Sequence, residues 1–317
     1  MIYEYAVEPS LILAWADSDR DYAEFLREYG LGTPRIISSF PKKNGGKLRR
    51  YLLKKGPVDN SKQSTRRYTE MVEAIAKNVI ERETHEDLSP AWPEAVIAES
   101  SHIPFDVVLS STPIGVPENI ELTGMYKPDS KWNHKRQQSF SRTKNELYSI
   151  FSNLIRLSTD RIVIVDPYAH AEPAIEFIGY MIRHMSDRRP HQALPAIEVF
   201  YKDIRSNNAR VTAPAAHHLL QQILAKVGDV ASAYKITVTS LVEKEGSDTF
   251  HNRCILTEHG GISTGHGIGL SGEEEHTDEA TLLENDIYEK KWRQFVEDNR
   301  FEVVSSETRP ASLNAHQ

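Results

Sequence analysis

Residues 250–270 read FHNRCILTEHGGISTGHGIGL, and this stretch gathers the chain's densest group of reactive and conformationally permissive residues. It holds three histidines, one arginine, one carboxylate and five glycines, separated by two short apolar runs. Gly260-Gly261 is a strong two-residue turn signal. Side chains two positions apart on a strand leave the same face, so His251 and Arg253 are expected to point together. The stretch therefore predicts a β-hairpin that presents both residues beside a glycine-rich return strand around residues 265–267.

The chain before and after this hairpin alternates between strand and helix patterns from residue 139 onward. Predicted strands cover residues 161–168, 196–201, 235–241 and 301–304. Predicted helices cover residues 143–157, 173–185, 214–227 and 283–297. The strand at 161–168 is a continuous β-branched run that ends in Asp166-Pro167, which is typical of a strand buried on both faces. The alternation predicts an α/β fold in which a mixed sheet is covered by helices.

The first part of the chain has a looser pattern. Predicted strands cover residues 2–7, 35–40 and 105–109, and predicted helices cover 21–29 and 64–82, the second with Ser64 as its N-cap. Gly45-Gly46 indicates a turn, and the sequence around Pro90 and Pro93 reads as irregular. Residues 113–135 are rich in proline and glycine and are the best candidate for a linker or a long surface loop. We expect an α+β region at 1–130 and a second domain at 139–317.

Bulk composition indicates a soluble globular protein. The 317 residues are 39% hydrophobic and 26% charged, and no apolar run approaches the ~20 residues that span a bilayer. The N-terminus lacks the basic and apolar regions of a secretory signal. A single cysteine, Cys254, excludes an internal disulfide framework and a multi-cysteine zinc site, and it fits a reducing compartment. We expect a cytoplasmic protein without membrane insertion.

Charge is unevenly distributed although the net charge is −7. Residues 31–67 carry eleven Lys or Arg against one acid, and residues 271–317 carry twelve Asp or Glu against five Lys or Arg. Basic residues that interleave with an aromatic residue such as Tyr51 can hold phosphate and stack a base. The candidate nucleic-acid-binding residues are Lys42, Lys43, Lys47, Arg49 and Arg50. The alternative is that both segments are ordinary solvated surfaces.

The order of residues in 250–270 resembles the phospholipase D superfamily. The signature of that superfamily is His-x-Lys, then Asp, then a Gly-Ser/Thr segment. Here His251 is followed by Arg253 where the lysine would be, by Glu258 where the aspartate would be, and by Gly265-His266-Gly267 where the glycine segment would be. The resemblance covers residues 145–305. The same stretch also resembles the phospholipase D-like C-terminal domain of MIT-domain proteins, which is regarded as a binding domain.

The resemblance implies a phosphodiesterase that needs no metal or cofactor. A neutral histidine attacks phosphorus to form a phospho-histidine, and a second histidine protonates the leaving oxygen. It implies His251, Arg253, Glu258 and His266 as catalytic residues, with Gly265 and Gly267 against the phosphate. One such motif is evident, so the second imidazole comes either from His251 of a second copy in a homodimer or from His266.

Three function classes follow from these patterns. The leading hypothesis is a nuclease, and the overall layout resembles bacterial proteins of anti-phage or mobile-element defence, which implies partner proteins in a defence complex. The second is a catalytically inactive module that binds phosphate or nucleic acid in an assembly. The third, a domain that binds anionic lipid headgroups, is disfavoured by the negative net charge and the lack of an anchor. Alternatively, His251 is an ordinary surface histidine and Asp166 an ordinary strand terminator.

Overall fold

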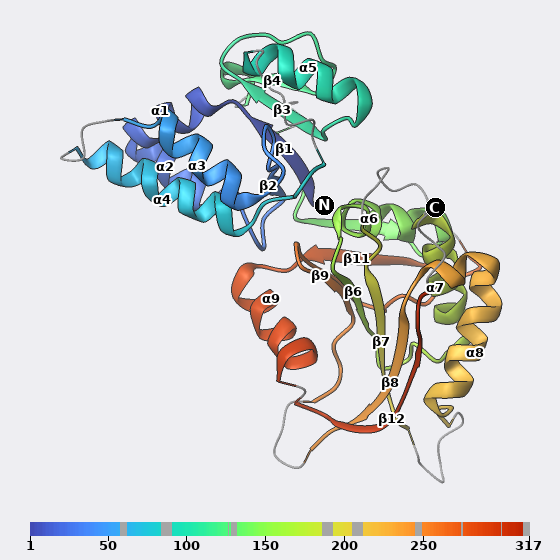
Figure 1. The fold of residues 1–317 in the computed structure, drawn as a ribbon. Coiled ribbons are helices and arrows are strands. Elements are labelled where there is room, and N and C mark those ends of the chain that lie inside the picture. Colours follow the sequence, from blue (N-terminus) through green and yellow to red (C-terminus); the bar gives the residue numbers. More distant parts are fainter. Residues whose placement is uncertain are drawn as a thin grey trace. The chain divides into compact units, whose positions relative to one another are not determined.

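A computed structural model describes residues 1–57, 62–83, 91–125, 127, 132–185, 193–204, 212–244, 249–273, 275–298 and 300–312 (Figure 1). The chain divides into two compact units, Met1–Arg136 and Gln137–Gln317. The sequence-based boundary, with domains at 1–130 and 139–317, stays a prediction about how the chain folds. Within the described residues, no helix has the length and apolar character needed to cross a bilayer.

The N-terminal unit is built on a four-stranded sheet in the order β2-β1-β3-β4. Its strands are β1 (Tyr3–Val7), β2 (Arg35–Ile37), β3 (Val107–Ser110) and β4 (Asn119–Glu121). Its helices are α1 (Pro9–Asp17), α2 (Asp19–Glu28), α3 (Gly45–Lys55), α4 (Gln63–Lys77), α5 (Trp92–His102) and the 3₁₀ turn η1 (Leu122–Gly124). Every strand pair is parallel. Because parallel strands require crossover connections, this unit is α/β and not the expected α+β.

Three local expectations for this unit were wrong. Gly45 begins helix α3 instead of a turn, and the Asn44 side chain caps the helix by accepting from the Lys47 N–H at 2.9 Å. A Cβ at Gly45 would lie 2.4 Å from the Ala76 carbonyl oxygen, so the glycine permits close packing of α3 on α4. Pro93 lies in the first turn of α5, where a missing N–H costs nothing. Helix α4 starts after Lys62, and Ser64 lies inside it.

The C-terminal unit contains an eight-stranded mixed sheet in the order β12-β8-β7-β6-β9-β10-β11-β5. Its strands are β5 (Gln137–Ser141), β6 (Arg161–Val165), β7 (Ala196–Lys202), β8 (Ile236–Val242), β9 (Cys254–Thr257), β10 (Gly260–Thr264), β11 (Thr277–Leu282) and β12 (Glu302–Arg309). Its helices are α6 (Lys144–Leu157), α7 (Glu172–His184), α8 (Ala216–Val227), the 3₁₀ turn η3 (Gly228–Ala233), α9 (Asn285–Trp292) and the π-helical turn η4 (Arg293–Glu297). The predicted α/β fold, a mixed sheet covered by helices, is confirmed.

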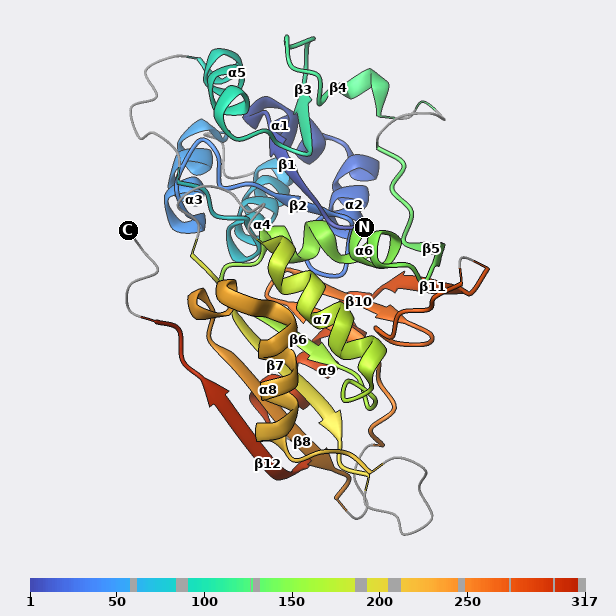
Figure 2. The same ribbon diagram turned by 90° about the vertical axis from the view of Figure 1, so that its right-hand side faces the viewer.

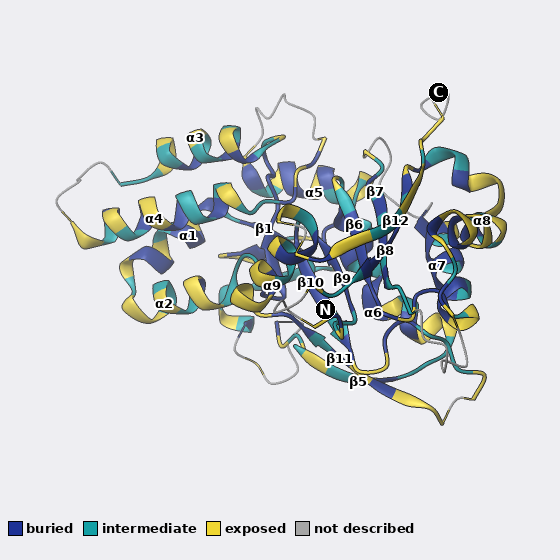
Figure 3. Cartoon of the chain, turned by 90° about the horizontal axis from the view of Figure 1, so that it is seen from below, coloured by how far each residue is buried: buried dark blue, intermediate teal, exposed yellow. Residues whose placement is uncertain are grey.

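Helices cover both faces of this sheet. α7 and α8 lie on one face, beside the parallel strands β6, β7 and β8, and α9 lies on the other (Figures 1 and 2). Covering both faces explains why β6 reads as a continuous apolar run, and its residues from Ile162 to Val165 are fully buried (Figure 3). β12 closes the edge with mostly exposed side chains, and its charged residues protect an edge strand from further pairing.

The expected hairpin is present, with a different turn. β9 and β10 pair antiparallel with Thr257 opposite Gly260, so Glu258 and His259 form the turn. Gly260, with φ of 137°, starts the return strand. A Cβ at Gly261 would lie 2.5 Å from a Leu256 methyl carbon, so this glycine serves side-chain packing and not the turn itself.

Candidate functional site

The carboxyl end of β6 is the place where Asp166, Arg253 and the loop after β10 meet. β9 runs antiparallel to β6 with Cys254 opposite Val165, so Asp166, the next residue after β6, lies beside Arg253, the residue before β9. The sequence predicts that Arg253 lies on a strand, but β9 begins only at Cys254, so Arg253 lies just before the strand. We call the group formed by Asp166, Tyr168, Arg253, His266 and Asp278 the Arg253 site.

Asp166 is the buried carboxylate of the site, and it binds two backbone amides. Its side chain is 2% exposed, and its carboxylate accepts from the Tyr168 N–H at 2.8 Å and from the Ile268 N–H at 3.0 Å. Burial raises the pKa of Asp166, and the two backbone hydrogen bonds and the positive charge of Arg253 counteract this. The carboxylate therefore joins the end of β6 to the loop after β10.

Arg253 is held from two sides. Its Nη1 donates to the Gly265 carbonyl at 2.6 Å, and its guanidinium carbon lies 5.6 Å from the centre of the Tyr168 ring, which is itself 51% exposed. In the described structure, the buried Arg253 Nε has no hydrogen-bond partner, and neither has the buried hydroxyl of Thr264. Thr264 is joined to Arg253 through backbone pairing, with its N–H 3.2 Å from the Arg253 carbonyl. The described residues therefore leave part of the hydrogen-bonding capacity of Arg253 and Thr264 unused.

His266 and Asp278 form a histidine–carboxylate dyad next to Arg253. The His266 side chain is 66% exposed, whereas the Asp278 side chain is 4% exposed. The imidazole Nδ1 lies 3.3 Å from one carboxylate oxygen of Asp278, and the His266 N–H donates to the other at 2.9 Å. In the tautomer that donates from Nδ1 to Asp278, the lone pair of the ring lies on Nε2. His266 directly follows Gly265, whose carbonyl binds Arg253.

The two site glycines pack against these carboxylates. A Cβ at Gly265 would lie 2.7 Å from Asp278 Oδ1, and one at Gly267 would lie 2.0 Å from Asp166 Oδ2. Gly267 also has φ of 80°, a backbone conformation that favours glycine. The amides at 266 and 268 donate to the carboxylates. Close packing on the two carboxylates explains why glycine occupies positions 265 and 267. The expected contact of these glycines with phosphate stays a prediction.

His251 lies two residues before Arg253 and is exposed. It lies near Glu243, whose carboxylate accepts from the Lys202 ammonium at 2.6 Å and from the Phe250 N–H at 2.8 Å. The lysine bond, the Phe250 bond and, further down, His251 all lower the pKa of Glu243. His251 precedes β9, whereas His266 follows β10.

Glu258 does not join the site, contrary to expectation. It follows β9, whereas Arg253 precedes β9, so the strand separates the two residues. Glu258 instead accepts from the Ser158 hydroxyl at 2.8 Å, the Thr159 N–H at 2.5 Å and the Asp160 N–H at 3.1 Å. Burial acts to raise the pKa of Glu258, but His259 and these hydrogen bonds outweigh it and lower the pKa. A carboxylate next to the hairpin turn cannot reach the residues at its open end.

Replacing Glu258 with glutamine is expected to lower the free energy of unfolding by about 2 kcal/mol at pH 7, because hydrogen bonds to a charged acceptor are lost. The folded-state pKa of Glu258 is lowered, so its contribution is present above the unfolded pKa and is lost as the pH falls through the folded pKa. Urea denaturation should therefore show the difference between wild type and Glu258→Gln shrinking below about pH 4. Glu307→Gln, on the exposed edge strand β12, is the control. A difference that stays constant with pH would contradict the assignment.

The basic segment lies in the N-terminal unit. Some of its arginines form ion pairs with carboxylates, whereas other cations line a groove. Arg49 donates from Nε to both carboxylate oxygens of Glu73, at 2.7 and 2.8 Å, so it is committed to helix α4. The other four predicted residues line a groove on α3 together with Tyr51 and Lys54. Sequence reasoning treated Arg49 and Arg50 alike because it had no means of locating Glu73.

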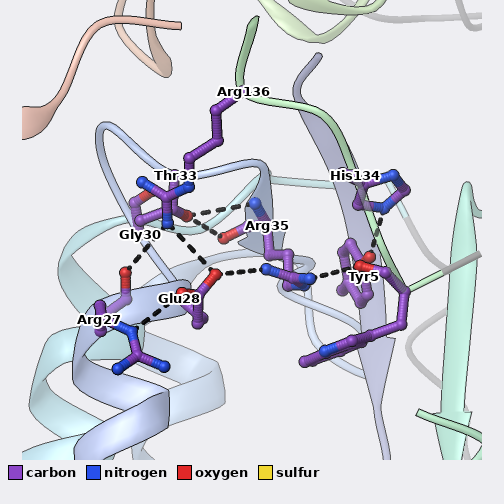
Figure 4. A network of polar contacts seen from close by, with 9 residues as sticks. Tyr5, Arg27, Glu28, Gly30, Thr33, Arg35, His134 and Arg136 are labelled. Atoms are coloured by element: carbon purple, nitrogen blue, oxygen red, sulfur yellow. Dashed lines mark hydrogen bonds and ion pairs between the residues drawn. The ribbon is translucent and has the colours of Figure 1, made fainter. Parts of the chain in front are cut away.

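Arg35, which the sequence places in the same basic segment, is buried. Its side chain is 5% exposed and its Nη1 pairs with Glu28 at 2.7 Å, while the guanidinium lies 3.9 Å from the centre of the Trp132 ring (Figure 4). Nearby, the Tyr5 hydroxyl lies 2.5 Å from His134 Nε2. Burial and then Arg35 lower the pKa of His134 to about 3, so this histidine is neutral. Arg35 thus belongs to the interior and not to a binding surface.

Asp166 and Asp278 are the site residues that sequence reasoning assigned differently or missed. Asp166 was visible at the end of a predicted strand, and its position before Pro167 also fitted a simple strand terminator. Asp278 lies on β11, which the sequence did not predict. In the described part of the chain, no group of three or more His, Cys, Asp or Glu residues is arranged to hold a metal ion.

Comparison with protein-family models gives no match, and comparison with curated proteins gives none either. Among solved structures, the chain is similar to Nuc, a phospholipase D family member from Salmonella typhimurium, with 10% identity and a TM-score of 0.34 over 53% of this chain and 97% of that one. It is also similar to TrmBL2, an archaeal chromatin protein described as showing a novel mode of DNA binding, with 8% identity and a TM-score of 0.27 over 57% of this chain and 59% of that one. Similarities at this level do not establish family membership or function.

Proposed function

We propose that the C-terminal unit is a phospholipase D-like phosphodiesterase that cleaves nucleic acid without a metal. The observation that carries the proposal is the His266–Asp278 dyad, an exposed imidazole oriented by a buried carboxylate, one residue after the carbonyl that binds Arg253. A nucleophile, its orienting acid and a phosphate-binding cation are the three groups that transfer through a phospho-histidine requires.

The proposed reaction has two steps. The His266 Nε2 lone pair attacks phosphorus, the new P–N bond forms, and the bond to the leaving oxygen breaks as a second imidazole donates its proton to that oxygen. Water then attacks the phospho-histidine, gives its proton back to the second imidazole, and the P–N bond breaks. Arg253 stabilises the equatorial phosphate oxygens in both steps, and its planar fork suits them.

The second imidazole in this proposal is His251. It lies two residues before Arg253 in the chain and is exposed, and in this proposal it supplies the acid within one chain. The alternative arrangement is a homodimer that brings a second His251 to the site. Solution mass separates the two arrangements, since an active strict monomer excludes the dimer. A bacterial defence or mobile-element context with partner proteins, in the cytoplasm, is proposed from the resemblance of the layout alone.

A second candidate function is a phosphate-binding module without turnover. It is favoured by the position of Glu258, because the acid that the motif supplies lies at the other end of β9. The two candidates differ in one measurable outcome, bond cleavage.

We expect the full-length chain to cleave labelled single-stranded DNA or RNA in the presence of EDTA, because the proposed nucleophile is an imidazole and not a metal-bound water. Mass spectrometry of acid-labile, base-stable adducts should place the phosphoryl group on His266. In His251→Ala, hydrolysis of the phospho-histidine should be slower, so that the adduct accumulates. Binding without any cleavage of either nucleic acid would reject the enzyme in favour of the binding module. Cleavage that stops on chelation would reject the phospho-histidine chemistry.

A further inference from the structure

The N-terminal unit has a basic groove of defined composition on helix α3. Its cavity volume is about 420 Å³, and it is lined by the segment Pro41–Lys43 and by one face of α3. The cations that line it are Lys42, Lys43, Lys47, Arg50 and Lys54, and the aromatic residue is Tyr51. The volume is within the range of about 300–1,000 Å³ typical of ligand sites.

Helix geometry explains the convergence of these side chains. Lys47, Arg50, Tyr51 and Lys54 are spaced at i, i+3, i+4 and i+7, so all four lie on one face of α3. Arg50 and Lys54 are exposed, while Tyr51 is half-buried and forms part of the groove wall. The ammonium groups of Lys42 and Lys55 each lie 5.3 Å from the centre of the Tyr51 ring. The ring is therefore surrounded by cations.

The groove differs from the rest of the basic segment in its charge balance. Arg35, Arg49 and Arg67 pair with Glu28, Glu73 and Asp19 respectively. The described residues that line the groove include no carboxylate. Like charges gathered in one concave place repel each other, and a polyanion relieves this repulsion on binding.

We infer that this groove binds single-stranded nucleic acid, with an unpaired base stacked on Tyr51 and the neighbouring phosphates on the surrounding cations. Several cations within one cavity fit a ligand with repeated phosphates. An aromatic ring in the groove wall fits a base with a free face, and stacking of this kind tolerates any base. In a duplex the bases are paired and stacked on each other, so no base face is free to stack on the Tyr51 ring. A base at Tyr51 displaces one flexible lysine ammonium from the ring, and that ammonium then reaches a phosphate.

This inference rests on the proposed function, because it names the form of nucleic acid that the same chain would act on. Binding is therefore measured separately from cleavage, in the full chain carrying His266→Ala. Single-strand binding without cleavage by wild type would reject the enzyme and keep the groove assignment. Cleavage by wild type without groove-dependent binding would reject the groove assignment alone.

Fluorescence anisotropy with a labelled oligonucleotide of about 15 nucleotides, as DNA and as RNA, each single-stranded and as a duplex, tests the inference. We expect the single strands to bind about tenfold more tightly than the duplexes, and Tyr51→Ala to remove that preference while Tyr51→Phe keeps it. Arg50→Ala should weaken binding and reduce the slope of log affinity against log salt by about 0.7. The charge-neutral double variant Arg49→Ala/Glu73→Ala should weaken binding much less. Circular dichroism confirms that each variant is folded.

Equal binding of single strands and duplexes, unchanged by Tyr51→Ala, would overturn the inference and leave a nonspecific anionic surface. An equal heparin concentration for half-displacement of the oligonucleotide from wild type and from Tyr51→Ala would overturn it as well, because the ring would then add nothing to oligonucleotide affinity. Absence of binding to every oligonucleotide at low salt would reject the groove as a nucleic-acid site.

Discussion

Replacing His266 with alanine is expected to reduce the rate of phosphodiester cleavage by at least about 10³-fold, because the variant lacks the proposed nucleophile. Binding of the oligonucleotide should change little, since Arg253 keeps its hydrogen bond to the Gly265 carbonyl. The measurement is kcat and KM with a labelled single strand, together with mass spectrometry for the phosphoryl adduct. The adduct at position 266 should disappear in the variant.

Two further variants make this prediction specific. His276→Ala is the matched control, since His276 is also an exposed histidine of the same region and pairs with Glu273 and Ser271. It should retain wild-type cleavage. Asp278→Asn tests positioning, because the amide cannot stabilise the developing imidazolium. It should lower kcat more than it changes KM, and it should shift the acid limb of the pH–rate profile. Full activity in His266→Ala, with loss in His251→Ala, would move the nucleophile to His251.

Replacing Gly267 with alanine is expected to lower the free energy of unfolding by about 3 kcal/mol or more, because the substitution combines backbone strain with a steric clash. The residue has φ of 80°, and its Cβ would lie 2.0 Å from the buried Asp166 carboxylate. That carboxylate cannot move freely, since it holds the Tyr168 and Ile268 amides. Urea denaturation followed by circular dichroism measures the loss.

Gly272→Ala is the control for this second prediction. A Cβ at Gly272 would meet nothing within 4 Å, so the change should stay within about 0.5 kcal/mol of wild type. A Gly267→Ala variant as stable as Gly272→Ala would show that the loop does not pack on Asp166. Loss of cleavage in Gly267→Ala at a temperature where the chain is folded would tie the same loop to the orientation of His266.

Much of the C-terminal fold could be predicted because its signals are local. The β-branched run at 161–165 and the apolar spacing of the helices from 143 to 227 depend on neighbours a few residues away, and the structure confirms them. The strands β5 and β11 were not predicted. Both lie toward the sheet edge, and both are short and mostly polar, so they resemble loops in sequence.

The candidate site divides in the same way. The proximity of Arg253 to the loop after Gly265 follows from the hairpin, since the first and last residues of paired strands meet at its open end. The prediction that Glu258 belongs to the site was wrong, because Glu258 lies at the hairpin turn and the site lies at the open end. Asp278 is twelve residues beyond His266 and reaches it only through the pairing of β10 with β11. Local spacing carries no information about that pairing.

By itself, the sequence determined the α/β class of the C-terminal unit, the presence of the hairpin and the concentration of cations around Tyr51, because periodicity, turn residues and local charge act over a few positions. Only the tertiary structure decided which charged groups work together. It paired Arg49 with Glu73 and left Arg50 in the groove, and it placed the buried Asp278 carboxylate behind His266. Electrostatic and hydrogen-bond partners are set by distances of a few ångströms in space, and segments far apart in the chain supply them.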